Sequence, residues 1–249
     1  MIKFFRKIRY NLMEQNKIGK YLLYAIGEII LVVLGILIAL QINNWNESNK
    51  ISKEEHGLLV NLKRDFTSNM KLISSGLDDY HIDLAYQAAA IRYTGPNVRI
   101  PTNAAIDSVS YINYTIVELV YGSINPTFNP NRIELLVNEN LRGKIADFMV
   151  ALTKYKEGEN VSKELALELR RIHQNYIWLM ENNNWSIGVE NLQSLNPASD
   201  YAGWFRDRKH QNVAADRTGA INYCIKQLTS LQKQIITIQN LIEIELRRF

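Results

Sequence analysis

An acidic residue lies in a long apolar stretch near the beginning of the chain. Residues 24–47 read YAIGEIILVVLGILIALQINNWNE, with Glu28 near the start of the apolar run. An ionised carboxylate inside a bilayer costs about 2.5 kcal/mol or more unless it is protonated, paired or turned toward protein. At about 100° per residue on a helix, Glu28 shares one face with Val32, Gly35 and Ala39. Gly35 and Ala39 form a small-xxx-small pair, which lets membrane helices approach closely enough for polar side chains to hydrogen-bond across the contact. These four residues are the candidate site for helix packing or proton handling.

Three interpretations of Glu28 stay open. In the first, the carboxylate reaches the inner membrane surface and meets Lys17 or Lys20 of its own tail. In the second, it determines packing in a homo-oligomer or in a complex with another membrane protein. In the third, it handles protons or ions, as in single-span subunits of ion-driven motors, which share the outline of a short basic tail, one span with an acid and an extracytoplasmic domain. No peptidoglycan-binding pattern follows the span, and such motors also need a multi-span partner.

The other residue types that support catalysis or metal binding are scattered. The chain has four histidines and one cysteine, at His56, His81, His173, His210 and Cys224. Asp79, His81 and Asp83 stand at i, i+2 spacing, which turns them to different helix faces, and no Glu-x-x-His or His-x3-His pair occurs. The sequence has no Gly-rich phosphate loop and no Cys/His nucleophile arrangement. We therefore expect no metal site, no cofactor and no enzymatic activity, and we interpret Cys224 as a small core residue.

The residues around Glu28 have the length and composition of a membrane span. From Tyr21 to Ile42, only Glu28 and Gln41 are clearly polar. A helix of this length measures about 33 Å at ~1.5 Å per residue, which matches a hydrocarbon core of about 30 Å. A cleaved signal peptide is the competing interpretation. However, the apolar run exceeds the roughly 7 to 15 residues of a signal peptide, and no small-x-small cleavage site follows it. We predict an uncleaved transmembrane helix over residues 21–42.

The flanking charges predict the orientation of this helix. The first twenty residues carry six basic side chains against the single acid Glu14; the basic residues are Lys3, Arg6, Lys7, Arg9, Lys17 and Lys20. Only Lys50 and Lys53 follow closely after the span, so the positive-inside rule places the N-terminus in the cytoplasm. Trp45 suits the opposite headgroup level, and we expect it to anchor the helix together with the basic tail. Residues 51–249 carry 22 basic and 22 acidic side chains, so no binding face for nucleic acid is expected.

Helical periodicity dominates the rest of the chain. Apolar residues at three- and four-residue steps predict helices at about 52–93, 105–121, 132–155 and 162–180, with Asn160 or Ser162 as the cap of the last one. The most regular seam is Ile221, Cys224, Leu228, Leu231, Ile235, Ile238 and Ile242, which predicts a long final helix packed in a bundle. Aromatic residues gather at Tyr176, Trp178, Trp185, Tyr201, Trp204 and Phe205, and we interpret them as core or bundle cap, with an aromatic ligand pocket as the alternative. No strand-period segment exceeds about five residues, so the expected fold is all-α.

Two segments carry a resemblance to known proteins. MIKFFRKIRYNLMEQNKIGKYLLYAIGEIILVVLGILIALQINNWNE, residues 1–47, resembles the opening of an uncharacterised family of small single-span membrane proteins from Bacteroidota-type bacteria, known only as a domain of unknown function. PTFNPNRIELLVNENLRGKIADF, Pro126 to Phe148, resembles a second segment of that family, in which a Thr-Phe-Asn-Pro turn leads into a helical region. The resemblance implies a bacterial inner membrane and a periplasmic domain. It brings no known activity.

These inferences give one expected organisation. Residues 1–20 form a basic cytoplasmic tail, residues 21–42 a transmembrane helix, and residues 43–249 a periplasmic antiparallel helical bundle with a long C-terminal helix. We expect a non-enzymatic, single-pass inner-membrane protein that acts as an oligomeric scaffold or accessory subunit of a membrane complex. Its expected partners are the lipid bilayer and either further copies of itself or other membrane proteins. The alternative is an ion-coupled, stator-like subunit that uses Glu28 as its protonatable group.

Overall fold

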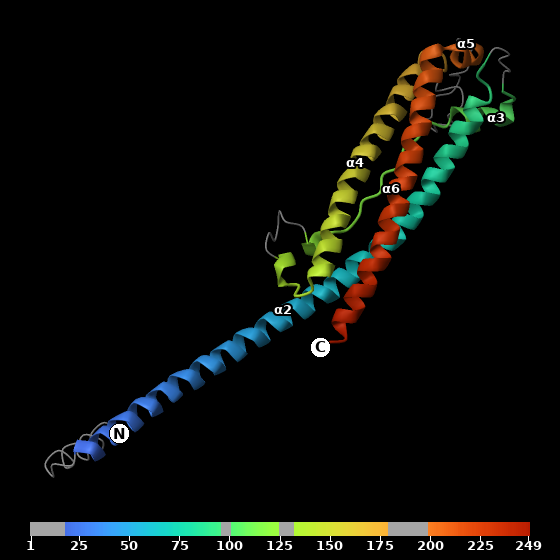
Figure 1. Cartoon of the computed structure of the whole chain (residues 1–249). Coiled ribbons are helices and arrows are strands. Elements are labelled where there is room, and N and C mark those ends of the chain that lie inside the picture. Colours follow the sequence, from blue (N-terminus) through green and yellow to red (C-terminus); the bar gives the residue numbers. More distant parts are fainter. Residues whose placement is uncertain (1–17, 96–100, 125–131, 179–198) are drawn as a thin grey trace, which may run out of the picture. The chain divides into compact units, whose positions relative to one another are not determined.

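The computed structural model describes residues 18–95, 101–124, 132–178 and 199–249 of the chain (Figure 1). Every regular element in these ranges is a helix, which confirms the predicted all-α fold. The chain divides into two compact units, Met1–His56 and Gly57–Phe249, and each is described by itself.

The first helix, α2 (Ile18–Ile91), contains the whole predicted span and most of the predicted helix 52–93. The connecting residues, NESNKISKEE, include neither proline nor glycine, so nothing in them interrupts the backbone hydrogen bonds of a helix. The helix ends two residues before the predicted boundary. A turn follows, in which Gly95 has a φ of 122°, a conformation that glycine adopts without steric cost.

Three helices build the second unit. The last part of α2 lies beside α4 (Glu139–His173) and α6 (Arg208–Leu246), and the most extensive helix–helix contact is between α4 and α6. Figure 1 shows that α2 and α4 run in the same direction and that α6 runs antiparallel to both. The chain must therefore travel back along the bundle between the end of α2 and the start of α4.

The three helices share one heptad-like pattern of burial. Buried residues follow alternating steps of three and four along α4 and α6, as the seam of a helical bundle requires. The main core cluster includes Leu59, Leu62, Phe66, Ile73, Tyr80, Leu141, Ile145, Phe148, Leu152, Tyr155, Ile221, Leu228, Leu231, Ile235, Ile238 and Ile242. The predicted seam of the final helix is thus confirmed, with Cys224 fully buried in it.

The two helices predicted at 132–155 and 162–180 are wrong as separate elements, because α4 runs through without a break. Asn160 and Ser162 lie inside α4 and cap nothing; the actual cap is Asn138, whose side chain accepts from the backbone N–H of Leu141. Gly158 does not mark an end either. It lies so close to Tyr223 of α6 that an added Cβ would come within 2.6 Å of the ring, so glycine is present for packing.

The helix predicted over residues 105–121 is also wrong. Helix α3 (Asn103–Ser110) covers only its beginning, and residues 111–121 are extended. We call residues 111–121 the strap; it is the segment that returns along the bundle (Figure 1). Its central side chains alternate between buried (Thr115, Val117 and Leu119) and exposed (Ile116, Glu118 and Val120), which is the period of an extended chain and suits its β-branched residues. Two short 3-10 turns, η1 (Gly122–Ile124) and η2 (Arg132–Leu135), come before α4.

A second apolar cluster closes the other end of the bundle. Helix α5 (Tyr201–Arg206) brings Tyr201, Trp204 and Phe205 against the ends of its neighbours. We call the cluster Ala90, Val109, Ile172, Ile177, Tyr201, Trp204 and Phe205 the cap cluster. Of the aromatic residues predicted as core or cap, Tyr201, Trp204 and Phe205 are buried here and Tyr176 packs beside them. Trp178 is partly buried, and Trp185 lies outside the described residues.

Candidate functional site

The predicted site residues lie on one exposed face of α2. Glu28, Val32, Gly35 and Ala39 are all in the helix, at the spacing that puts them on a common stripe. Glu28 is partly buried, whereas Val32 is 55% exposed. A Cβ built on Gly35 would meet no atom within 4 Å.

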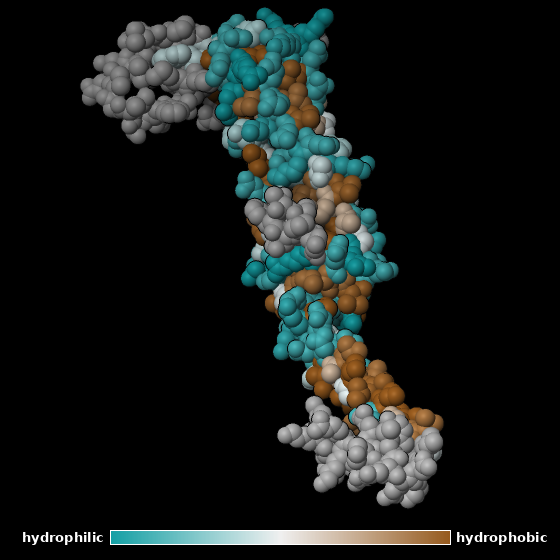
Figure 2. All heavy atoms as spheres, turned by 90° about the vertical axis from the view of Figure 1, so that its left-hand side faces the viewer, coloured by the Kyte–Doolittle hydropathy of each residue, from teal (hydrophilic) through white to brown (hydrophobic). Residues whose placement is uncertain are grey.

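The apolar surface around this stripe is uncovered within the described part of the chain. In the most apolar stretch of α2 none of the residues is buried, and α2 is the one described helix that is long and apolar enough to cross a membrane. Leu31, at 71%, is among its most exposed side chains. The same surface appears brown in the lower part of Figure 2. An exposed apolar surface of this size requires lipid or protein to cover it.

Two of the predicted anchoring residues, Trp45 and Lys20, belong to the described part of the chain. Trp45 lies on α2 with its side chain 68% exposed, as an interfacial anchor requires. Lys20 belongs to the same helix. The remaining basic residues of the predicted anchor, Lys3, Arg6, Lys7, Arg9 and Lys17, lie outside the described residues.

In the second unit, the strap is held by side chains rather than by a sheet. Asn69 of α2 binds the backbone of Val120 twice: its Nδ2 donates to the carbonyl and its Oδ1 accepts from the N–H, both at 2.6 Å. On α4, the Glu159 carboxylate accepts from Val117 N–H at 2.8 Å, and Lys156 Nζ donates to Val117 O at 2.9 Å. Buried backbone groups need such partners, and here polar side chains supply them.

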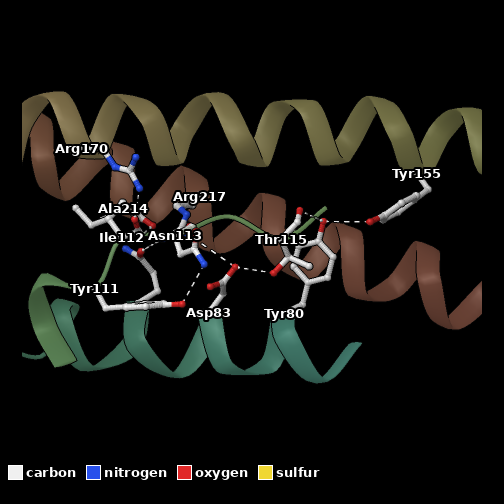
Figure 3. A network of polar contacts seen from close by, with 11 residues as sticks. Tyr80, Asp83, Tyr111, Ile112, Asn113, Thr115, Tyr155, Arg170, Ala214 and Arg217 are labelled. Atoms are coloured by element: carbon white, nitrogen blue, oxygen red, sulfur yellow. Dashed lines mark hydrogen bonds and ion pairs between the residues drawn. The ribbon is translucent and has the colours of Figure 1, made fainter. Parts of the chain in front are cut away.

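The end of the strap nearer α3 is held by two arginines. Arg170 of α4 donates to the carbonyl of Ile112 at 2.9 Å, and Arg217 of α6 donates to the carbonyl of Asn113 (Figure 3). The strap therefore contacts all three long helices through hydrogen bonds, since Asn69 and Tyr80 bind it from α2.

Arg217 also belongs to a buried group that we call the polar belt: Asp83, Gln87, Thr115 and Arg217. Figure 3 shows Asp83, Thr115 and Arg217 of this group. Arg217 Nη1 donates to Gln87 Oε1 at 2.9 Å, and its Nη2 lies 3.8 Å from Asp83 Oδ2. Thr115 Oγ1 donates to the same carboxylate at 3.0 Å. Burial raises the pKa of Asp83 and lowers that of Arg217, while the attraction between the two opposes both shifts. Asp83 and Arg217 thus form a buried charge contact, and most of their other polar atoms have hydrogen-bond partners.

Next to the polar belt, two tyrosines meet in the core. The hydroxyl groups of Tyr80 and Tyr155 lie 3.3 Å apart, and Tyr155 donates to Glu159 at 2.6 Å. Burial raises the pKa of both tyrosines and of the Cys224 thiol, so all three are neutral and unreactive at ordinary pH. This group forms part of the buried interior of the bundle.

Two histidines flank Trp204 at the edge of the cap cluster. The ring of His173, at the end of α4, lies 4.6 Å from the Trp204 ring, and that of His210, at the start of α6, lies 4.8 Å from it. Both are buried, and burial lowers the pKa of each to about 4. Trp204 Nε1 donates to His210 Nδ1 at 3.0 Å.

Sequence reasoning missed these polar residues, although a signal was present. His210, Arg217 and Glu245 continue the three- and four-residue steps of the α6 seam beyond its apolar part, and all three are buried. On α4, Glu159 and His173 occupy equivalent seam positions. Polar residues at seam positions indicate buried hydrogen-bond partners, but a search restricted to apolar residues passes over them.

The described residues contain no group of three or more His, Cys, Asp or Glu side chains that could hold a metal ion. Asp83 is buried while Asp79 and His81 are exposed.

Comparison with known proteins gives one similarity. Residues 28–80 match the model of a family of unknown function (DUF6090). The match begins at Glu28 and includes Val32, Gly35 and Ala39, and it confirms the resemblance to a family of unknown function. The match does not include residues 1–27, so the first part of the N-terminal resemblance, the bacterial group and the second segment, Pro126 to Phe148, stay predictions. No curated protein and no solved structure matches the chain.

Proposed function

We propose that this chain is a single-pass, non-enzymatic membrane protein whose helical bundle assembles with further copies or docks onto a larger membrane complex. The observation that carries the proposal is the uncovered apolar part of α2 in a chain whose other long helices bury their apolar seams. Lipid covers most of such a surface, because the bilayer core excludes water and a helix satisfies its own backbone groups there.

The stripe on α2 supports assembly. Glu28 is costly in a lipid-facing position, and Gly35 and Ala39 remove the side-chain bulk that would keep a second helix away. A neighbouring helix at this face would shield the carboxylate and pack closely against the glycine. The bundle is then the part that carries specificity outside the membrane.

The basic residues before the span support one orientation, with the N-terminus in the cytoplasm and the bundle in the periplasm of a bacterial inner membrane. In this topology, residues 1–20 are the cytoplasmic tail and residues 43–249 the periplasmic domain.

Mass measurement of the protein purified in mild detergent tests the proposal. The wild type should form a self-complex or retain a co-purifying membrane protein. Glu28→Gln and Gly35→Ile should each lose most of it, at least about tenfold, because a lost interhelical contact of ~1.4 kcal/mol or more changes association by that factor.

Gly27→Ile is the matched control. It makes the same change on α2, where an added Cβ also meets no atom within 4 Å, but it lies about 80° away from Gly35 around the helix. It should leave the complex intact. A strictly monomeric wild type, or variants that all behave alike, would contradict the assembly proposal and leave Glu28 to the membrane-surface or ion-handling interpretation.

A further inference from the structure

The two histidines beside Trp204 have no complete set of hydrogen-bond partners. His173 and His210 are 4% and 2% exposed. The Nε2 atoms of both are buried and have no partner among the described residues. His210 accepts from Trp204 at Nδ1, so its neutral ring carries the proton on Nε2. Both rings are therefore held as neutral groups against apolar and aromatic surfaces.

Protonation is incompatible with this arrangement. A second proton on His210 occupies Nδ1, which changes the acceptor for Trp204 Nε1 into a donor and breaks that hydrogen bond. On His173, a second proton introduces a positive charge in a buried position where Nε2 has no acceptor among the described residues. Protonation of His210 therefore removes a hydrogen bond that holds α5 against α6, and protonation of His173 places a buried charge against α5.

The charged groups around the two histidines do not offset the free-energy cost of protonating them. Arg170 on α4 repels a charge on His173, and each histidine repels the other. Asp207, between α5 and α6, attracts a charge on His210, but its carboxylate already accepts from Tyr176 Oη at 2.9 Å and from the backbone N–H of Lys209. From the turn after α2, Tyr93 contributes a ring stacked on Phe205.

The described side chains of α3 at this cluster, Ile106 and Val109, are apolar. Tyr201 of α5 adds a ring 6.5 Å from that of Trp204. Burial is the largest effect on both histidines and lowers the pKa of each to about 4.

The cap cluster is also separate from the main core. Its apolar residues form their own group, and the polar belt around Arg217 lies between it and the residues from Ile221 onward. Opening of the cap cluster therefore removes no contact within the main core. Local opening of such a unit requires less free energy than global unfolding.

We propose that the cap cluster is an acid-operated latch: when His173 and His210 take up protons, α5 leaves the ends of α4 and α6 while the three-helix core stays folded. The surface that this movement uncovers is the aromatic face of Trp204 and Phe205.

The sign of the pH dependence follows from the lowered pKa values. A histidine with a pKa of about 4 when closed and about 6.5 when exposed stabilises the closed state fully above pH ~6.5, and this contribution is lost as the pH falls toward 4. The opening equilibrium should rise up to about tenfold per pH unit for each histidine, or up to about a hundredfold for both together.

Trp204 reports the opening directly. The full-length protein in detergent micelles, with Trp45, Trp178 and Trp185 changed to Phe, leaves Trp204 as the one fluorophore of its kind. Acrylamide quenching of Trp204 and far-UV circular dichroism are followed in parallel from pH 7.5 to pH 3.5. Quenching should increase at a higher pH than that at which helical signal is lost. Loss of both signals at one pH would overturn the latch, since it would mean global unfolding.

Variants assign the effect to the histidines. His173→Phe removes one protonatable ring but keeps an aromatic side chain, so the opening should move to lower pH and its steepness should fall toward about tenfold per pH unit. His81→Gln, which changes an exposed histidine on α2, should have no effect. An unchanged pH profile in His173→Phe would contradict the proposal. If the variant does not fold, histidine C2-proton NMR of the wild type decides: two histidines must titrate together with the Trp204 transition.

Discussion

Arg217 illustrates how single polar residues specify this bundle. It occupies a seam position on α6 that an apolar residue would fill in a plain helical bundle, and it is 1% exposed. Its guanidinium contacts three groups from two other parts of the chain, Asp83, Gln87 and the carbonyl of Asn113. The planar, multi-donor shape of arginine fits this arrangement, which a lysine could not satisfy.

Removal of the Arg217 side chain should therefore strongly lower the free energy of unfolding. Arg217→Met leaves the Asp83 carboxylate buried without its cation, and we expect a loss of about 3–5 kcal/mol in the free energy of unfolding. Urea unfolding of the full chain in detergent, followed by far-UV circular dichroism, measures this loss.

The double variant Arg217→Met with Asp83→Asn is the control for the charge. It leaves no charge in the belt, and Asn can still accept from Thr115, so it should be more stable than Arg217→Met alone. Effects of the two changes that simply add would show that the two side chains do not interact.

At the scale of elements, the strap joins the three long helices. Val117 packs directly over Gly76 of α2, where a Cβ would overlap with Val117 Cγ2. Thr115 and Leu119 on either side of it are buried, and Asn69 holds the backbone of Val120. The close approach of strap and helix thus depends on a glycine at one seam position.

Gly76→Ala should displace the strap. The overlap with Val117 should lower the free energy of unfolding by about 1–3 kcal/mol, although alanine is the better helix former. Chemical denaturation measures the change, and Val117→Ala in the same chain should relieve part of it.

Gly219→Ala is the matched control on α6, because a Cβ there meets nothing within 4 Å. It should raise the free energy of unfolding by up to about 1 kcal/mol. If Gly76→Ala were stabilising to the same extent, the strap would not be packed against α2 at this point.

The elements that depend on local apolar spacing could be predicted from the sequence. Prediction was wrong where contacts with distant residues determine the structure. The span and the final helix have uninterrupted apolar spacing, and both predictions agree with the helices of the structure. Of the apolar residues at three- and four-residue steps on α2, Leu59, Leu62, Phe66 and Ile73 lie in the core. Farther along the helix than Phe66, Met70, Leu77 and Leu84 only flank it. The buried positions there include Asn69, Gly76 and Asp83, whose partners lie on the strap.

The strap itself was not predictable from periodicity. Its backbone groups bond to side chains of Asn69, Glu159 and Lys156, which are distant in sequence, instead of to residues four positions away. Apolar residues within TIVELV fit a helix stripe about as well as an extended segment when these partners are unknown. The pairing of His173 with His210 was also not predictable from local pattern, because the two residues come from different helices.

At the scale of the whole molecule, the two units meet different solvents under our proposal. Unit Met1–His56 contains the apolar surface that needs lipid, whereas unit Gly57–Phe249 has its own buried core. Membrane attachment and bundle folding should then be separable properties of the chain.

Reporter fusions test the orientation. Alkaline phosphatase joined after Phe249 should be active, because it folds only outside the cytoplasm, and green fluorescent protein at the same place should stay dark. The matched control places both reporters after Lys20, before the span, where the results should be reversed. An inactive phosphatase after Phe249 would contradict the proposed topology.

The hydrogen bonds of the strap and of Arg217 join residues far apart in the sequence, so each forms only after its later partner has been synthesised. Asn69 meets its partner 51 residues later in the chain, Asp83 meets Thr115 after 32 residues, and the Asn113 carbonyl meets Arg217 only after 104. While the ribosome is still adding those later residues, the emerging α2 exposes a face on which Asn69, Asp83 and Gln87 interrupt the apolar row. Water solvates these groups until their partners arrive, so the polar seam lowers the tendency of the unfinished chain to aggregate.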